Sequence, residues 1–469
     1  MDRKLKEELL NSLPDEWPDD LLPEIQAQVK ASHRKLVVLD DDPTGTQTVH
    51  SIPVLTDWSV ETLQAELAND LPAFYLLTNS RSLPLAEARA MNAEIGHNLV
   101  EAARQANREF AVVSRSDSTL RGHFPGEVSA LADALAQDFD AWLIIPFFLE
   151  GGRYTIDDVH YVAEGEWLVP AGETEFARDA AFGYRASNLR QWVEEKTGGR
   201  IPAETVRSIS IQDIRRGGPE RVARRLADVR AGSVCVINAA SYRDVEVFVG
   251  GLLAAEARGQ RFLYRTAASF VRVRAGLTPR SLLGQAELGV PASGGGLFIV
   301  GSHVPRTTSQ VNALLAQPTV VSLEVNVEAL LDEARRAREI EGIVQKVDQA
   351  LDRDQDVVIY TSRQLITGQD AESSLSIGQR ISEGLVAILR GISTRPRYLV
   401  GKGGITSSDL ATRGLNVRRA LVLGQILPGV PVWRLGPESR YPGMPYIVFP
   451  GNVGGPEALV EIVTTLRRG

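Results

Sequence analysis

Three consecutive carboxylates, Asp40 to Asp42, follow the apolar run 36–39 and precede Pro-Thr-Gly-Thr. The apolar run predicts a buried strand, so the acids should leave a sheet at its carboxyl edge, where α/β proteins bind ligands. Adjacent carboxylates repel one another and need a positive group, a metal ion or a substrate proton nearby. The pattern therefore favours a ligand site, and a solvated acidic turn is the structural alternative.

A second polar loop, residues 114–127, follows another apolar run. Its candidate site residues are Arg115, Ser116, Asp117, Ser118 and Arg121. Arginines bind carboxylates, hydroxyl groups bind sugar oxygens, and an Asp can accept a proton. Arg81 follows a third apolar run, 73–77. If the sheet is parallel, the three strand ends share one edge, and the arginines either bind a substrate or only neutralise the acids of residues 40–42.

The acids also allow a different chemistry. Asp40-x-Asp42-x-Thr44 after a strand fits the nucleophile motif of haloacid dehalogenase phosphatases, in which Asp40 would attack phosphorus and Asp42 would act as acid and base. That chemistry also requires a downstream Lys and a second acidic pair. We find no well-placed strand end that carries them.

Three loops in the second half of the chain lead from an apolar run toward a helical stretch. They read "IVGSHVPRTTSQ", "LVGKGGITSSDLA" and "IVFPGNVGGPEAL". Glycines let backbone N–H groups approach phosphate oxygens, and helix N-termini favour negative charge, so the three together favour a nucleotide-phosphate site. The chain has neither a Walker P-loop nor a Gly-x-Gly-x-x-Gly motif opening either half, which argues against a Walker ATPase and an evident NAD enzyme.

The rest of the chain predicts an α/β protein of two tandem domains, each with a largely parallel sheet flanked by helices and with the active site in the cleft between them. We expect strands at 35–39, 73–77, 110–114, 141–145, 233–238 and 261–265, and helices at 85–107, 125–138, 326–350 and 372–391. The segment 146–200 has few such runs, and we expect it to include a long ordered loop.

Domain limits follow from composition. Residues 1–33 predict a helical extension broken by Pro14, Pro18 and Pro23, residues 34–285 a substrate domain, and residues 286–469 a nucleotide domain. The boundary falls near residue 285 because the stretch 276–296 is rich in Gly and Pro and has no long apolar run.

Composition narrows the functional class. The chain has 469 residues, 43% hydrophobic and 23% charged, with a net charge of −8. Its Lys and Arg residues are dispersed, which argues against a nucleic-acid surface, and no apolar run is long enough to predict a membrane helix. The single cysteine, Cys235, lies in an apolar run and predicts an inert core thiol in a reducing cytoplasm. No His and Cys spacing predicts a transition-metal site.

As a whole, the chain resembles the four-carbon acid sugar kinase family, whose members phosphorylate threonate, erythronate or their oxo derivatives with ATP. The matching pieces occur in family order: "LDDDPTGTQ", "NSRS", "SDSTLRG", "GRYTIDDVHYV", "VGSHVPRTTSQ", "GKGGITSSD" and "FPGNVGG". The resemblance implies an acid-sugar domain followed by a nucleotide domain, with ATP and Mg²⁺ as cofactors.

The resemblance also assigns residues. It implies that the acid binds to Asp41, Asp42, Arg81, Arg115, Ser116, Asp117 and Ser118, and the position of Arg121 adds a further cation. ATP contacts are implied at Ser302, Gly403, Gly404, Ile405, Thr406, Gly451, Asn452 and Gly454. Asp42 or Asp117 would orient or deprotonate the attacking hydroxyl group, and Asp40 has no assigned role.

The working hypothesis is a cytoplasmic kinase for the terminal hydroxyl group of a small sugar acid. Its expected partners are the sugar acid and ATP, with no nucleic acid and no membrane, and a homodimer is compatible with this interpretation. The alternatives are the phosphatase that uses Asp40 and a sensor that binds sugar acid and nucleotide without catalysis.

Overall fold

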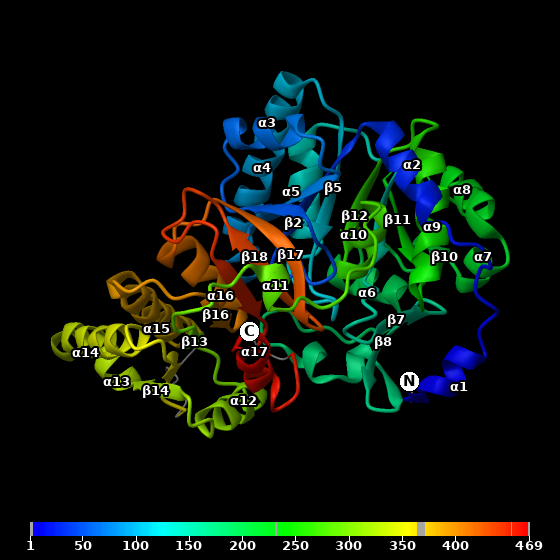
Figure 1. Cartoon of the computed structure of the whole chain (residues 1–469). Coiled ribbons are helices and arrows are strands. Elements are labelled where there is room, and N and C mark those ends of the chain that lie inside the picture. The colour runs from blue at the N-terminus through cyan, green and yellow to red at the C-terminus, as the bar shows by residue number, and fades with distance from the viewer. Residues whose placement is uncertain (1–2, 230–231, 364–370, 452, 468–469) are drawn as a thin grey trace. The chain divides into compact units, whose positions relative to one another are not determined.

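The computed structural model describes residues 3–229, 232–363, 371–451 and 453–467, and the chain forms two compact units (Figure 1). Unit 1 comprises the residues up to Ile52 together with Asp57–Pro279. Unit 2 comprises Pro53–Thr56 and the residues from Arg280 onward. The division between Pro279 and Arg280 lies within the Gly- and Pro-rich stretch 276–296. The short segment 53–56 joins unit 2 because Thr56 N–H donates to the Arg418 carbonyl group at 3.0 Å.

The centre of unit 1 is a parallel sheet. Its strand order is β10 (Arg207–Ile209), β11 (Ser233–Ile237), β6 (Ala141–Ile145), β12 (Phe262–Thr266), β5 (Phe110–Arg115), β2 (Lys35–Asp40) and β4 (Ala73–Leu77). Continuous apolar runs form these strands because helices cover both faces of such a sheet. In the register, Asp40 is level with both Arg115 and Leu77, so three carboxyl ends meet at one edge.

Helices pack around this sheet in two groups (Figure 1). One group contains α3 (Val60–Ala68), α4 (Leu85–Ala106) and α5 (Gly126–Leu135). The other contains α2 (Leu22–Ser32), α7 (Ile211–Arg215), α8 (Gly218–Ala227), α9 (Tyr242–Glu256) and α10 (Ala268–Arg274). Local signals fix several helix starts: Ser210 and Ser241 form capping boxes with Asp213 and Asp244.

The segment 146–200 includes the expected loop, at residues 171–188, but it is not a loop throughout. This segment forms β7 (Arg153–Ile156), β8 (Val159–Glu164) and β9 (Trp167–Pro170), which are antiparallel neighbours, followed by α6 (Leu189–Lys196). The strands are short, and tight turns separate them, with positive φ angles at Asp157, Asp158 and Gly165. Such hairpins leave only brief apolar runs, which is why the periodicity of the segment was weak.

The N-terminal segment is part of unit 1. Strand β1 (Lys4–Leu5) pairs with β9, and α1 (Lys6–Asn11) follows it. Helix α2 packs on α9 and α10 and buries Ile25 and Val29. The extension is divided as expected: Pro14 and Pro18 lie between α1 and α2, and Pro23 lies in the first turn of α2, where proline starts a helix.

Unit 2 contains a mixed sheet. Its order is β17 (Arg419–Leu427), β18 (Val430–Leu435), β19 (Pro445–Phe449), β16 (Leu399–Lys402), β13 (Leu297–Val300), β15 (Asp356–Thr361) and β14 (Val320–Val325). The strands from β19 to β14 are parallel, whereas β17, β18 and β19 are antiparallel neighbours. The sheet is therefore mixed and largely parallel, as expected.

Two groups of helices cover this second sheet. Helices α12 (Pro305–Leu315), α17 (Ala458–Arg467) and the short α11 (Gln285–Leu288) form one, and their apolar residues pack with Phe298, Val400 and Ile447 in one core cluster. Helices α13 (Val327–Leu331), α14 (Glu333–Leu351), α15 (Ala371–Gly391) and α16 (Gly404–Asp409) form the other. The single helix expected at 326–350 is divided at Asp332, whose side chain caps α14.

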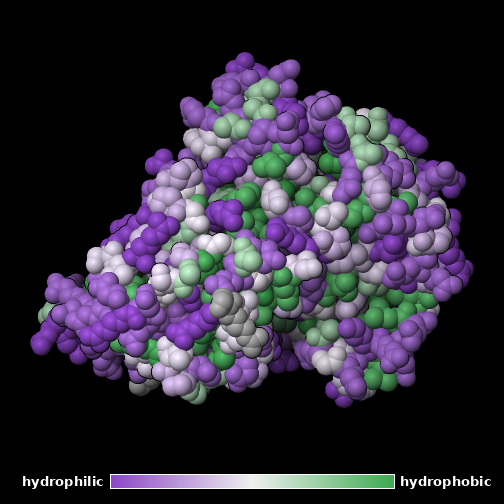
Figure 2. Space-filling model, viewed as in Figure 1, coloured by the Kyte–Doolittle hydropathy of each residue, from purple (hydrophilic) through white to green (hydrophobic). Residues whose placement is uncertain are grey.

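The face drawn in Figure 2 is mostly hydrophilic, with scattered hydrophobic groups. Leu85, Val100, Leu282, Val304 and Ile405 are the large hydrophobic side chains that are exposed among the described residues. Within the same ranges, no helix combines the length and hydropathy needed to cross a membrane. Cys235 is a free, buried thiol, and burial raises its pKa to about 12, as expected for an inert core residue.

Candidate substrate and nucleotide sites

The carboxyl ends of β2, β4 and β5 bring the acids and arginines of unit 1 together. The deepest pair is Asp40 with Arg115: both side chains are buried, and Arg115 Nη1 lies 3.2 Å from Asp40 Oδ1. Burial raises the pKa of Asp40 to about 7, although the Arg115 charge opposes this shift. Gly45 covers the carboxylate so closely that a Cβ atom there would overlap it. Asp40 and Arg115 therefore form the floor of the site.

The next acid, Asp41, is held by residues at the carboxyl end of β5. The Ser116 hydroxyl group donates to Asp41 Oδ2, and Asp41 N–H donates to the Arg115 carbonyl group at 3.2 Å. The other carboxylate oxygen, Oδ1, is buried without a hydrogen-bond partner. A buried polar atom without a partner is costly, and it marks a place for a ligand donor.

Asp42 and Asp117 meet at Arg81. Arg81 Nη2 forms an ion pair with Asp42 Oδ2, and Arg81 Nη1 lies 3.6 Å from Asp117 Oδ1. The other face of Asp117 receives Arg121 Nε at 2.7 Å and the Thr119 hydroxyl group. Despite its burial, these positive groups hold the pKa of Asp117 well below its usual range. The side chains of Arg81 and Arg121 keep 19% and 25% of their surface exposed, so they form the open rim of the site.

Ser118 lies beside this rim and is fixed by His160. His160 Nε2 lies 2.8 Å from the Ser118 carbonyl oxygen, and its other ring nitrogen lies 3.0 Å from the Thr155 hydroxyl group. Burial lowers the pKa of His160 to about 4, so the ring is neutral near pH 7. The arrangement supports a structural role for His160.

Two residues of this cluster were missed from the sequence. Arg265 in β12 donates to the Arg121 carbonyl group at 3.0 Å, and burial lowers its pKa. Glu127 in α5 is buried, and its burial together with the Asp41 charge raises its pKa to about 7. Arg265 is a single charge within an apolar run, and that unusual placement was the only signal available for it. Glu127 follows Pro125 and Gly126 at the start of a helix, where an acid is ordinary, and gave no signal.

In unit 2 the glycine loops after β13, β16 and β19 converge. The Thr307 hydroxyl group lies 3.1 Å from Ser302 Oγ and donates to the Gly451 carbonyl group at 3.0 Å. Gly403 has a φ angle of +115°, and a Cβ atom there would lie 3.1 Å from Ser302 Cβ. Ser302, Gly403 and Gly451, predicted from separate motifs, are therefore neighbours, as three adjacent loops around a phosphate would be.

The remaining predicted nucleotide residues lie on the same loops. Gln310 of α12 donates to the carbonyl groups of Val453 and Gly455 at 2.9 and 3.0 Å, and to that of Gly454 at 3.3 Å. Gly404 and Thr406 are in α16, and Ile405 between them exposes 54% of its surface. Asn452 lies outside the described residues.

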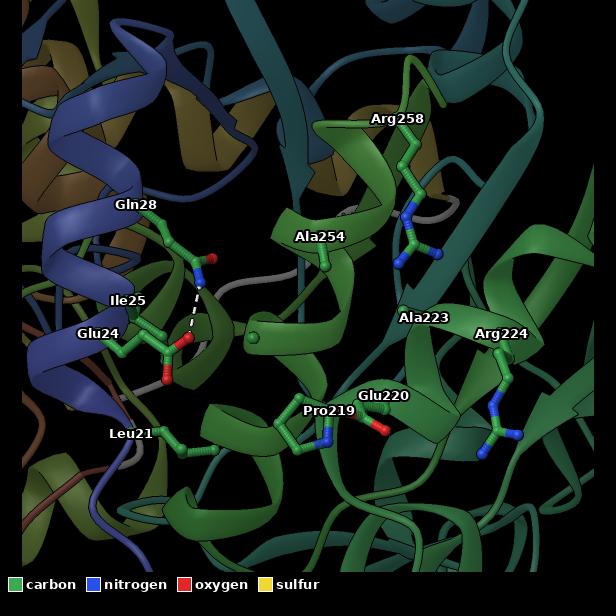
Figure 3. A pocket seen from close by; sticks show the side chains of 11 residues that line it. Leu21, Glu24, Ile25, Gln28, Pro219, Glu220, Ala223, Arg224, Ala254 and Arg258 are labelled. Atoms are coloured by element: carbon green, nitrogen blue, oxygen red, sulfur yellow. Dashed lines mark hydrogen bonds between the residues drawn. The ribbon is translucent and has the colours of Figure 1, made fainter.

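One pocket of unit 1 lies away from the predicted site residues. A pocket of about 430 Å³ lies between α2, α8 and α9, and Figure 3 shows Arg224 and Arg258 at its side and Gln28 bonded to Glu24. None of the predicted site residues lines it. Within the described ranges, no three His, Cys, Asp or Glu side chains gather as metal ligands.

Comparisons with known proteins match the two parts of the chain to separate domain families. Residues 36–274 match the family described as "Sugar-binding N-terminal domain", and residues 297–459 match "Nucleotide-binding C-terminal domain". The chain is 25% identical to the D-erythronate kinase of Heliobacterium modesticaldum over 379 residues, which cover 76% of this chain and 79% of that protein.

Solved structures share the fold. A Salmonella typhimurium LT2 protein is 17% identical with a TM-score of 0.65, over 91% of this chain and 98% of that one. A Haemophilus influenzae protein is 18% identical with a TM-score of 0.61, over 92% of this chain and 100% of that one.

The fold and the two families define a protein with a sugar-binding domain followed by a nucleotide-binding domain. The chain belongs to the four-carbon acid sugar kinase family, which confirms the resemblance seen in its motifs.

Proposed function

We propose that this chain is an ATP-dependent kinase that phosphorylates the terminal hydroxyl group of a four-carbon sugar acid such as erythronate, threonate or an oxo-tetronate. The observation that carries the proposal is the cluster of Asp42, Asp117, Arg81 and Arg121 at one sheet edge. A small polyhydroxy acid needs cations for its carboxylate and acceptors for its hydroxyl groups, and this cluster offers both. The erythronate kinase relative supports the substrate class.

Within the cluster, we assign the carboxylate to Arg81 and Arg121, which are partly exposed and can bind it through two N–H groups each. Asp42 is the favoured base for the attacking hydroxyl group. Arg121 and Arg81 hold the pKa of Asp117 low, which makes it a poor base, and we assign it to positioning the two arginines. Asp41 Oδ1 would accept a hydrogen bond from a substrate hydroxyl group.

The triphosphate of ATP would bind at the loops of Ser302, Gly403 and Gly451. The exposed apolar residues Val304 and Ile405 follow the neighbouring strands β13 and β16 and would contact the adenine base. Mg²⁺ would neutralise the phosphates, as phosphoryl transfer requires. Because the described residues offer no group of three metal-binding side chains, the phosphate oxygens and water would supply most of its ligands.

The phosphatase alternative is weakened by the position of Asp40. A nucleophile must reach the substrate, whereas this carboxylate is buried, paired with Arg115 and covered by Gly45. The three glycine loops of unit 2 would also have no role in such an enzyme.

Coupled ADP release from the purified chain, with ATP, Mg²⁺ and a panel of four- to six-carbon sugar acids, tests the proposal. We expect turnover with at least one four-carbon acid and weaker turnover with longer ones. ATP binding without turnover on any acid would contradict a kinase and favour the sensor. Phosphate release from sugar phosphates that is abolished in Asp40→Asn would favour the phosphatase.

A further inference from the structure

Lys402, the last residue of β16, is a buried cation beneath the glycine loops of unit 2. Its side chain has no exposed surface, and its Nζ atom donates to the Pro450 carbonyl group at 2.5 Å and the Gly451 carbonyl group at 3.3 Å. The ammonium group also lies 4.0 Å from the centroid of the Phe449 ring. The position of the Lys402 ammonium group is therefore set by the loop after β19.

The groups around this ammonium do not balance its charge. Among the described residues, the charge that acts on the pKa of Lys402 is that of Arg306 of α12, which is also positive. The other titratable groups around the loops are His303 and Arg363, which interact with each other, and Tyr446 of β19, which donates to the Ser407 carbonyl group. Two acids act on these groups, Glu324 on Arg363 and Asp409 on Tyr446, but neither is among the charges that shift the pKa of Lys402. A buried charge without a counter-ion is costly.

The carbonyl groups that Lys402 holds belong to the predicted phosphate loops. Gly451 also accepts the Thr307 hydroxyl group, which contacts Ser302. Lys402 thus links β16 to the loops after β13 and β19. An anion bound at these loops would lie close to an otherwise uncompensated positive charge.

We propose that Lys402 is a positioning residue of the nucleotide site: its ammonium group fixes the Pro450 and Gly451 carbonyl groups, and the phosphates of the bound nucleotide balance its charge. This inference rests on the proposed ATP-binding function and adds to it that nucleotide binding is coupled to the uptake of a proton.

Whether nucleotide binding takes up or releases a proton follows from the pKa of Lys402 in the protein without nucleotide. Burial, with a smaller effect of Arg306, lowers the pKa of Lys402 to about 7, so at pH 8 most of the amine is neutral. A nearby polyanion favours the charged form and raises the pKa. The amine then takes one proton from the solvent, and no bond of the nucleotide changes. At pH 6 the amine is already charged, and the uptake should disappear.

The test is calorimetric titration of the full chain with ATP and Mg²⁺, without sugar acid, in buffers of different ionisation enthalpy. At pH 8 we expect uptake of about one proton per ATP, and little uptake at pH 6. Lys402→Met should bind ATP about tenfold more weakly without proton uptake. Lys402→Arg, which stays charged, should retain binding without uptake.

Lys35→Met is the matched control, because Lys35 is also buried and donates to the carbonyl groups of Asn69 and Leu71, but lies in unit 1. Its proton uptake and ATP affinity should equal those of the unchanged protein. Thermal unfolding of each variant verifies folding. ATP binding without proton uptake, or equal uptake in Lys402→Met, would overturn the inference but leave the kinase proposal intact. No ATP binding by the unchanged protein would overturn both.

Discussion

Arg81 contacts both candidate acids of unit 1, Asp42 and Asp117. Its guanidinium group forms an ion pair with Asp42 and lies 3.6 Å from Asp117, and 19% of its side-chain surface is exposed. A carboxylate ligand would therefore compete with, or join, these two acids at one cation. The proposed function depends on this residue more than on Arg115, whose charge is already paired with Asp40 in the interior.

Arg81→Met should lower kcat/KM for the sugar acid roughly 100-fold, because a hydrogen bond to a charged group contributes about 1.5–3 kcal/mol. KM for ATP should change less than twofold. Initial rates at varied acid and ATP measure both. Arg104→Met is the control, since Arg104 forms an exposed pair with Glu101 on α4. Equal losses in both variants would contradict the role of Arg81.

The raised pKa of Glu127 predicts that the stability of the folded protein depends on pH. Burial raises its pKa to about 7, so the folded protein keeps this carboxyl group protonated where the unfolded chain ionises it. The folded state therefore binds the extra proton, and stability declines as pH rises from about 4.5 to 7. Glu127→Gln removes this decline, and its stability relative to the unchanged protein should rise by roughly 2–3 kcal/mol between pH 4.5 and 8.

Urea unfolding followed by tryptophan fluorescence measures the effect of Glu127→Gln. The signal reports on unit 1, because five of the six tryptophans (Trp17, Trp58, Trp142, Trp167 and Trp192) lie there. Parallel pH profiles for the variant and the unchanged protein would show that Glu127 is ionised in the folded state.

Site residues that follow an apolar run could be predicted from the sequence, whereas site residues within a strand or helix could not. Asp41, Asp42, Arg81 and Asp117 follow apolar runs, so a parallel sheet brings them to one edge, and they meet there because β2 lies between β4 and β5. Arg265 enters the site only because β12 lies next to β5, and a strand from the far end of the domain cannot be placed there from the sequence. The ion pairs that occupy Asp117 could not be predicted either.

At the scale of elements, helix α12 positions the last glycine loop. The Gln310 amide donates to the carbonyl groups of Val453, Gly454 and Gly455, and Thr307 of the same helix donates to that of Gly451. The proposed nucleotide site thus depends on a helix that contributes no glycine of its own.

Gln310→Leu preserves the size of the side chain and removes the hydrogen bonds of its amide group, each of which contributes about 0.5–1.5 kcal/mol. We expect KM for ATP to rise about tenfold while KM for the sugar acid stays within twofold. Gln317→Leu, just beyond the same helix, is the control because the Gln317 side chain donates to the Ala313 carbonyl group at 3.5 Å, away from the glycine loop. An unchanged KM for ATP in Gln310→Leu would separate this loop from nucleotide binding.

Elements with continuous apolar runs were predicted well, and short or alternating ones were missed. Strands β2, β4, β5 and β6 follow apolar runs and lie within one residue of the expected limits. Strand β14 alternates buried and exposed residues at the edge of its sheet, and the hairpins at 146–170 have runs too brief to recognise. Their pairing comes from contacts distant in sequence.

At the scale of the molecule, the N-terminal segment is a structural part of unit 1. Arg215 Nη1 donates to the Pro14 carbonyl group at 2.7 Å, and Gln26 Nε2 donates to that of Gly276 at 2.9 Å. The Trp17 ring packs directly on Gly218, where a Cβ atom would overlap it. The sugar-binding family match begins only at residue 36, so these contacts are additions to the matched domain.

A chain starting at Arg34 should lose the burial of Leu21, Ile25 and Val29 and the β1–β9 pair. We expect the calorimetric midpoint of unit 1 to fall by roughly 10 °C, since several kcal/mol are lost and each shifts a domain of this size by about 2–4 °C. The transition of unit 2 should stay unchanged. An unaltered midpoint for unit 1 would show that the segment is a passive extension.

Phosphoryl transfer to a sugar acid is observed directly by ³¹P nuclear magnetic resonance of the reaction mixture. With ATP, Mg²⁺ and the four-carbon acid that gives most ADP, we expect one new phosphomonoester signal coupled to CH₂ protons, equal in amount to the ADP formed. ADP matched by inorganic phosphate instead of an ester would contradict the proposed transfer.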